Sequence, residues 1–262
     1  MPSPTRIAYG DQPEQFANLH LPHASTSASD GQDLPVVVLI HGGFWRAKYG
    51  LDLMDPLAGD LCRAGYAAWN IEYRRVGQSG GGWPGTLHDV ARAIDHLAVV
   101  APAHRLDRDR VAFVGHSAGG HLALWSAGRA AIPAGSPGTG PRVVPVIAIG
   151  QGPVVGLRRA AHQRVGNGAV VDFLDGTPDD VPERYDAATP RLGAGPRMVA
   201  VVGSRDDVVP PEFSVDDDQP NAIEVVTIAG ADHMVLIEPG GEPWAVVRAL
   251  LDEALRSRPR AD

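Results

Sequence analysis

Residues 111–119 read Val-Ala-Phe-Val-Gly-His-Ser-Ala-Gly, a short apolar run that leads into a Gly-x-Ser-x-Gly pentapeptide centred on Ser117. The apolar run predicts a buried strand, and a helix-like stretch from His121 to Arg129 follows it directly. A sharp turn from strand to helix exposes the serine hydroxyl, and the free N–H groups of the helix N-terminus can stabilise an oxyanion. The pattern therefore predicts that Ser117 is a nucleophile for acyl transfer.

A second Gly-x-Ser-x-Gly match occupies residues 77–81. It follows the charged segment 72–75 and runs into Gly82-Trp83-Pro84, so it has neither a buried strand before it nor a helix after it. We interpret this second match as a glycine-rich loop.

A serine hydroxyl becomes nucleophilic when an adjacent base removes its proton and a third group orients that base. His233 follows the expected strand 222–228 within a glycine-containing loop, where a sheet hydrolase places its base. The acid is predicted after the strand 198–202, in the segment Gly-Ser-Arg-Asp-Asp-Val-Val-Pro. Asp206 is favoured because Gly-x-x-Asp-x-x-Val-Pro is similar to a familiar hydrolase pattern, and Asp207 is the alternative. The order Ser, Asp, His along the chain is typical of α/β-hydrolases.

An oxyanion hole needs two N–H donors that do not move during the reaction. Ala118 directly follows the predicted nucleophile, so its N–H is one expected donor. The other donors are predicted in His-Gly-Gly-Phe-Trp, residues 41–45, which leaves the first strong strand. Glycines there let the backbone approach a substrate, so Gly43 and Phe44 are the expected donors.

Short β-branched runs alternate with helix-like segments along the 262 residues, which predicts an α/β fold: a mostly parallel central sheet flanked by helices. The expected strands are 36–40, 66–71, 111–114, 143–149, 198–202 and 222–228. The expected helices are 51–64, 86–99, 121–129 and 244–255. Residues 1–262 are interpreted as one domain, with a lid insertion at about 152–195, because that stretch is rich in Gly, Pro, Asp and Arg and shows little periodicity.

Composition narrows the class of protein. The net charge of −8 carries no basic concentration, so nucleic acid is not an expected partner. No segment approaches the length of a membrane span, and the single cysteine cannot form a disulfide within the chain. We expect a cytoplasmic protein that acts on a small ester or amide, with a homodimer as an open alternative to a single chain.

The chain resembles the α/β-hydrolase superfamily from about Ala8 to Leu255. Residues 41–45 are similar to the HGGxW motif of serine-type kynurenine formamidases (arylformamidases) and related small esterases, and residues 115–121 are similar to the nucleophile elbow of that group. The resemblance implies a catalytic triad of Ser117, Asp206 and His233, with Gly43, Phe44 and Ala118 at the oxyanion. It also implies hydrolysis of N-formyl-L-kynurenine to kynurenine and formate, a step of tryptophan catabolism, with no metal and no cofactor.

The substrate is left open by these patterns. A formylkynurenine site needs aromatic walls, for which the candidates are Trp45, Tyr73, Trp83, Trp125 and Phe173. It also needs a cation for the substrate carboxylate, for which the candidates are Arg46, Arg74 and Arg158. Trp125 is expected in the core. The first hypothesis is an arylformamidase, the second a carboxylesterase for small acyl or aryl esters, and the third a ligand-binding protein on a hydrolase fold.

Overall fold

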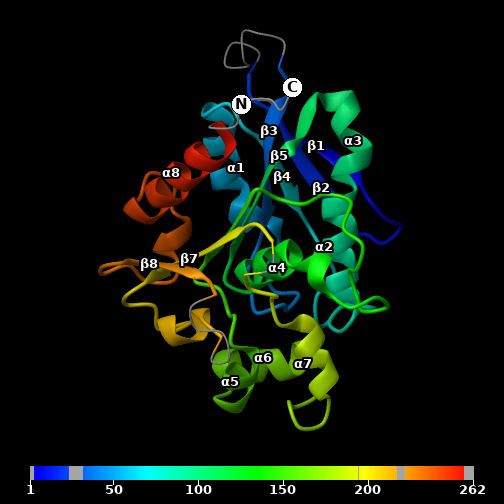
Figure 1. Ribbon diagram of the computed structural model, residues 1–262, viewed down its shortest axis with the longest axis vertical. Coiled ribbons are helices and arrows are strands. Elements are labelled where there is room, and N and C mark those ends of the chain that lie inside the picture. Colours follow the sequence, from blue (N-terminus) through cyan, green and yellow to red (C-terminus); the bar gives the residue numbers. More distant parts are fainter. Residues whose placement is uncertain (1–2, 24–31, 194, 217–221, 257–262) are drawn as a thin grey trace.

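The computed structural model describes residues 3–23, 32–193, 195–216 and 222–256, and it is built around one eight-stranded sheet (Figure 1). The strand order is β1-β2-β4-β3-β5-β6-β7-β8. The pairs β1/β2 and β2/β4 are antiparallel, and all other neighbouring pairs are parallel. The strands are β1 (Thr5–Ala8), β2 (Phe16–His20), β3 (Leu34–Ile40), β4 (Ala67–Ile71), β5 (Leu106–His116), β6 (Ile147–Gln151), β7 (Arg197–Gly203) and β8 (Glu224–Ile228).

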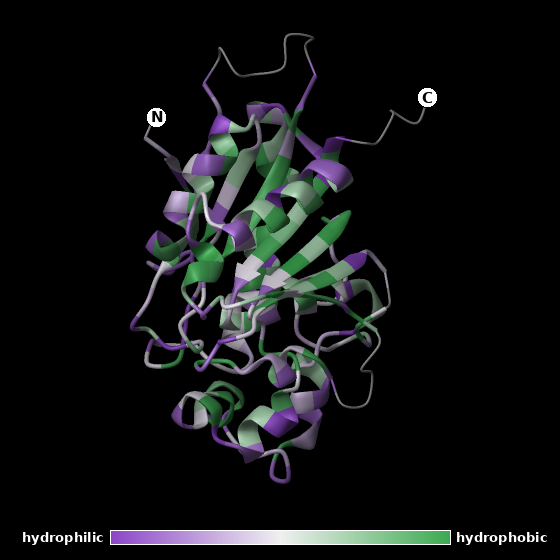
Figure 2. Ribbon diagram, turned by 90° about the vertical axis from the view of Figure 1, so that its left-hand side faces the viewer, coloured by the Kyte–Doolittle hydropathy of each residue, from purple (hydrophilic) through white to green (hydrophobic). Residues whose placement is uncertain are grey.

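The central strands are buried on both faces, as the continuous apolar run 36–40 predicts. Val36 and Val38 face one apolar core, and Val37 and Leu39 face the other, because successive side chains of a strand point to opposite sides. Hydrophobic residues accordingly fill the middle of the molecule in Figure 2. The sheet is therefore a packed scaffold from which the connecting loops project.

Helices cover the two faces of the sheet. The apolar residues of α1 and α8 pack on one face, and those of α2, α3 and α4 pack on the other (Figure 1). Their bounds are α1 (Asp55–Arg63), α2 (Gly85–Asp95), α3 (Leu97–His104), α4 (Ala118–Ala127) and α8 (Glu242–Arg256). Burial raises the pKa of the single thiol, Cys62 on α1, to about 11, so this thiol is protonated at neutral pH.

One expected strand begins later than predicted, and one hairpin was not predicted. The strand expected at 143–149 begins only at Ile147, because Pro145 has no N–H group to donate to the sheet. The hairpin β1–β2 was not predicted, because its two short strands carry mixed polar residues and lie at the edge of the sheet, where burial is incomplete.

The segment expected as an irregular insertion forms three short helices, α5 (Leu157–His162), α6 (Val165–Leu174) and α7 (Pro182–Ala188). They form a separate group beyond the carboxyl ends of the strands (Figures 1 and 2). His121 and Trp125 of α4 tie this group to the sheet, since their ring nitrogens lie 2.8 Å and 2.9 Å from the carbonyl oxygens of Ala188 and Ala187.

Candidate active site

Ser117 lies at the sharp turn between β5 and α4, with φ 57° and ψ −121°. This region of backbone space is strained for a residue with a side chain, and such strain persists where the surroundings hold it in place. Gly119 allows the turn, because a side chain there would overlap the carbonyl oxygen of Ile40. The turn is thus the nucleophile elbow that the sequence predicts.

The structure pairs His233 with Asp206 and not with Asp207. The His233 Nδ1 atom lies 2.6 Å from the Asp206 Oδ2 atom, and both side chains are buried. The second carboxylate oxygen of Asp206 accepts backbone N–H groups from Val208 at 3.0 Å and Val209 at 2.8 Å, so its orientation is fixed. Asp207 is exposed.

The pair of Asp206 and His233 lies beside the elbow. Gly152 lies directly against this pair, because a Cβ atom at this glycine would lie 3.1 Å from Asp206 Oδ2 and 3.2 Å from His233 Nδ1. The neighbouring residue, Gln151, accepts the Ser117 N–H group on its backbone oxygen at 2.8 Å. The residues predicted as nucleophile, acid and base therefore meet at the carboxyl edge of the sheet, although three different loops carry them.

The loop 41–45 packs directly on this elbow. A Cβ atom at Gly42 would lie 3.0 Å from the Ser117 Cβ atom, so the two backbones are in close contact. Gly43, Phe44 and Trp45 all have positive φ values, of 113°, 55° and 54°. This left-handed curl changes the direction of the chain where the loop packs on the elbow.

A buried ionic network supports the loop from behind. Glu72 lies 2.9 Å from His41 Nε2 and 3.1 Å from Arg75 Nη1, and it accepts the Leu51 N–H group. Burial by itself raises the pKa of Glu72, but the hydrogen bond and charge of His41, together with Arg75, outweigh burial and hold the pKa below its usual value. The other His41 ring nitrogen faces the Gly42 carbonyl at 2.8 Å, so His41 links the network to the loop.

Four of the five aromatic candidates for substrate walls have no exposed surface, which corrects the prediction for Trp45, Tyr73 and Phe173 and agrees with the core position expected for Trp125. Tyr73 donates its hydroxyl to the His41 carbonyl at 2.7 Å and stacks on the His41 ring, so it supports the loop. Trp45 is buried against Phe173, with the two rings stacked at 4.8 Å. Trp83 remains partly exposed. Tyr73 and Trp45 take these positions because the largest aromatic surfaces gain most free energy in the core.

Each cation predicted for a substrate carboxylate already binds a carboxylate of the chain. Arg46 binds Asp172 at 2.6 Å, Arg74 binds Asp89 at 2.7 Å, and Arg158 binds Asp186 at 2.7 Å. Arg46 also donates to the carbonyl oxygens of residues 166 and 167.

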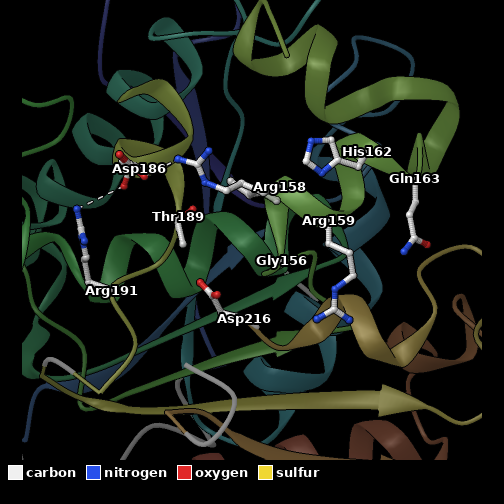
Figure 3. Close-up of a pocket in the computed structure, with 10 residues that line it drawn as sticks. Gly156, Arg158, Arg159, His162, Gln163, Asp186, Thr189, Arg191 and Asp216 are labelled. Atoms are coloured by element: carbon white, nitrogen blue, oxygen red, sulfur yellow. Dashed lines mark hydrogen bonds and ion pairs between the residues drawn. The ribbon is translucent and has the colours of Figure 1, made fainter. Parts of the chain in front are cut away.

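A polar cavity of about 530 Å³ lies in the insertion and not at Ser117. Helix α5 forms one wall, and in Figure 3 the Arg158 side chain extends to Asp186 across it. Among the residues that the structure describes, no group of His, Cys, Asp and Glu side chains is arranged to hold a metal ion, and no helix is long and apolar enough to cross a membrane.

Three contributors to the site were not predicted: Glu72, His116 and Gln151. Glu72 is 31 positions from His41, and no local pattern connects them. His116 fills a variable position of the pentapeptide, and Gln151 ends a strand whose polar last residue was the one available signal.

Comparison with known proteins agrees with the geometry. The family model BD-FAE matches residues 22–133, which is less than half of the chain. Esterase LipC of Mycobacterium tuberculosis is 28% identical over 226 residues, covering 79% of this chain and 52% of LipC. The chain thus spans about half the length of LipC.

Solved structures extend the likeness to the whole chain. A truncated carbohydrate esterase from gut microbiota superposes with a TM-score of 0.77 at 17% identity, covering 98% of this chain and 97% of the other. The propionate-bound esterase Est2 of Thermogutta terrifontis gives a TM-score of 0.72 at 21% identity, covering 99% and 97%. The sheet and the superpositions together show the α/β-hydrolase fold. Within it, the chain is similar to esterases of the BD-FAE and LipC type.

Proposed function

We propose that this protein is a serine carboxylesterase that cleaves esters with a short acyl group. The observation that carries the proposal is the strained serine at residue 117 beside the buried pair of Asp206 and His233. A hydrogen-bonded acid and base near a serine at a strained turn, with a glycine loop packed on that turn, is the arrangement that acyl transfer requires.

In the proposed reaction His233 takes the proton of the Ser117 hydroxyl as its oxygen attacks the ester carbonyl. The N–H groups of Gly43, Phe44 and Ala118 bind the tetrahedral oxyanion. His233 then gives the proton to the departing alcohol, which leaves Ser117 acylated. Water enters, loses a proton to His233 and attacks the acyl group, and Ser117 takes the proton back as the acid is released. Asp206 holds the His233 ring with Nδ1–H toward itself.

The paired cations favour an ester over N-formyl-L-kynurenine. That substrate carries an amino-acid carboxylate, and a buried charge without a partner is costly. Arg46, Arg74 and Arg158 are all occupied by carboxylates of the chain. To bind the substrate, one of them would have to break its ion pair. The sequence relatives named above are likewise esterases.

The packing behind the loop favours a short acyl group. The rings of Trp45, Phe173 and His121 form a closed aromatic cluster, with Trp45 and His121 rings 5.3 Å apart. Phe44 lies against Gly166 of the insertion, so the chain itself fills this side of the loop. Est2 has been solved with propionate and with butyrate bound, and these are acids of the short length proposed here for the acyl group.

The rim of the site favours an apolar alcohol. Tyr49, Val208 and Met234 are 41%, 38% and 49% exposed, so each offers apolar surface to a ligand. Tyr49 packs on Gly43. Val208 lies two positions after Asp206 in the chain, and Met234 directly follows His233. An alkyl or aryl leaving group would cover these side chains.

The test measures kcat/KM for a short-chain aryl acetate and for N-formyl-L-kynurenine, with Ser117→Ala as the blank. We expect brisk ester cleavage, little formamide cleavage, and a loss of several orders of magnitude in Ser117→Ala. A strong preference for the formamide would replace the carboxylesterase with an arylformamidase. A serine-reactive phosphonate that fails to label Ser117 would instead favour the ligand-binding hypothesis.

A further inference from the structure

The loop that carries the proposed base follows an edge strand of the sheet. His233 follows β8, which is an edge strand that pairs only with β7 and has exposed residues along most of its length. After His233 the chain forms a single 3₁₀ turn, Val235–Ile237. Contacts from strands in the middle of the sheet would hold the imidazole in place beyond this edge strand.

One anchor comes from β5, three strands away in the sheet. The Nε2 atom of His116 lies 3.0 Å from the backbone carbonyl oxygen of His233. A carbonyl oxygen can only accept a hydrogen bond, so His116 carries its proton on Nε2 and donates it. The two imidazole rings also pack together, with centroids 4.5 Å apart. His116 therefore holds both the backbone and the ring of His233.

This donor does not change with pH in the working range. Burial, followed by the charge at His233, lowers the pKa of His116 to about 3. The ring is therefore neutral at neutral pH and keeps one tautomer. Its Nδ1 atom is buried without a hydrogen-bond partner among the described residues, so the bond to His233 is the polar contact that sets its orientation.

The second anchor comes from β6. The side-chain N–H of Gln151 donates to the carbonyl oxygen of Leu236, three residues after His233. The backbone oxygen of the same glutamine accepts the Ser117 N–H group at 2.8 Å. His116 precedes Ser117 in the chain. The two anchors of the base loop are thus the two residues that also hold the serine.

From this juxtaposition we infer that His116 and Gln151 are positioning residues, which clamp the segment 233–236 onto the nucleophile elbow and set the distance between serine and imidazole. This inference rests on the proposed function. Proton transfer between the two groups depends steeply on that distance, and a misplacement of about 1 Å can cost about 100-fold in rate.

The test distinguishes the effect of the His116 hydrogen-bond donor from the effect of its aromatic ring. His116→Phe keeps an aromatic ring but removes the donor, and His116→Gln keeps a donor near the position of Nε2. Gln151→Met removes the second donor with little change in shape. We expect kcat for an aryl acetate to fall about 10- to 100-fold in His116→Phe and about 10-fold in Gln151→Met, with KM within about twofold. His116→Gln should recover most of the loss.

Matched controls are His162→Phe and Gln163→Met, which make the same changes at exposed positions of the insertion and should leave kcat unchanged. The rate of phosphonate labelling of Ser117 should fall in parallel with kcat, while circular dichroism and the melting temperature report folding. A purely structural role would lower the melting temperature without a kcat deficit that His116→Gln restores.

Wild-type kcat in folded His116→Phe and Gln151→Met, with Ser117→Ala inactive, would overturn the clamp and leave the proposed function standing. Full activity of Ser117→Ala would overturn both. If His116→Phe does not fold, Gln151→Met and His116→Gln still decide the question, because each leaves the volume of the site nearly unchanged.

Discussion

The carboxyl edge of the sheet and the helical insertion are built by different means. At the edge, backbone touches backbone: side chains at Gly115 and Gly119 would overlap carbonyl oxygens of neighbouring segments. In the insertion, exposed ion pairs carry many of the contacts, such as Arg158 with Asp186 and Arg184 with Asp175. Close backbone packing leaves no freedom, whereas exposed ion pairs contribute little free energy.

The two regions also place their backbone strain differently. At the edge, the residues with side chains and positive φ values are Ser117 at the elbow and Phe44 and Trp45 in the loop beside it. In the insertion, Arg164, Gly166, Asn167 and Gly168 are all left-handed, which interrupts the start of α6. The comparison indicates that the strain of the edge lies at the predicted nucleophile and the loop beside it, whereas that of the insertion lies at the start of a helix.

The largest expected effect tests the edge. Asp206→Asn should lower kcat by about 10⁴-fold, because the amide cannot hold the His233 tautomer that accepts the serine proton. Asp207→Asn, at the exposed neighbour, should change kcat by less than about twofold. Steady-state kinetics on an aryl acetate measures both. Equal losses in the two variants would show that the acid is wrongly assigned.

A second prediction concerns the free energy of unfolding at acid pH, which two buried histidines near the edge should lower. Burial lowers the pKa of His116 to about 3 and of His121 to about 4. The unfolded chain, in which histidine titrates near 6.5, binds more protons below that pH than the folded chain does. The free energy of unfolding should therefore fall as the pH drops from about 6.5 towards 3, by on the order of a few kcal/mol for each histidine.

Urea unfolding at pH 7.5 and pH 4.5 measures this loss. His121→Gln keeps a donor for the Ala188 carbonyl and removes the titrating ring, so its stability should depend less on pH than that of the wild type. His88→Gln, at an exposed histidine, is the control and should behave as the wild type. The same pH dependence in all three proteins would contradict the prediction.

The smallest expected effect tests the connection between the two regions. Arg46 follows the loop 41–45 and binds Asp172 of α6, with 32% and 48% of the two side chains exposed. Such a pair contributes less than about 1 kcal/mol. Arg46→Gln should therefore leave kcat within about twofold and raise KM about two- to fivefold, and Arg158→Gln should change neither. A large loss of kcat in Arg46→Gln would mean that the insertion takes part in forming the site.

Local patterns were sufficient for the elbow and for the frame around it. The apolar run before Ser117, the glycines beside it and the helix behind it are neighbours in the chain, so their meaning does not depend on distant residues. The parallel strands followed from the same kind of pattern. The helices of the insertion did not, because their glycines and charges hide a short apolar face that becomes evident only against the rest of the molecule.

The sequence by itself determined the predicted nucleophile and the order Ser, Asp, His in which the predicted catalytic residues follow one another along the chain. It ranked Asp206 above Asp207 but could not decide between them. Tertiary structure decided which aspartate meets His233, that Tyr73 and Trp45 point into the core, and that three arginines are already paired. It also brought Glu72 behind the loop and His116 onto the base. The physical reason is that burial and pairing depend on segments far apart in the chain, whereas a turn, a strand or a helix start is specified by its immediate neighbours.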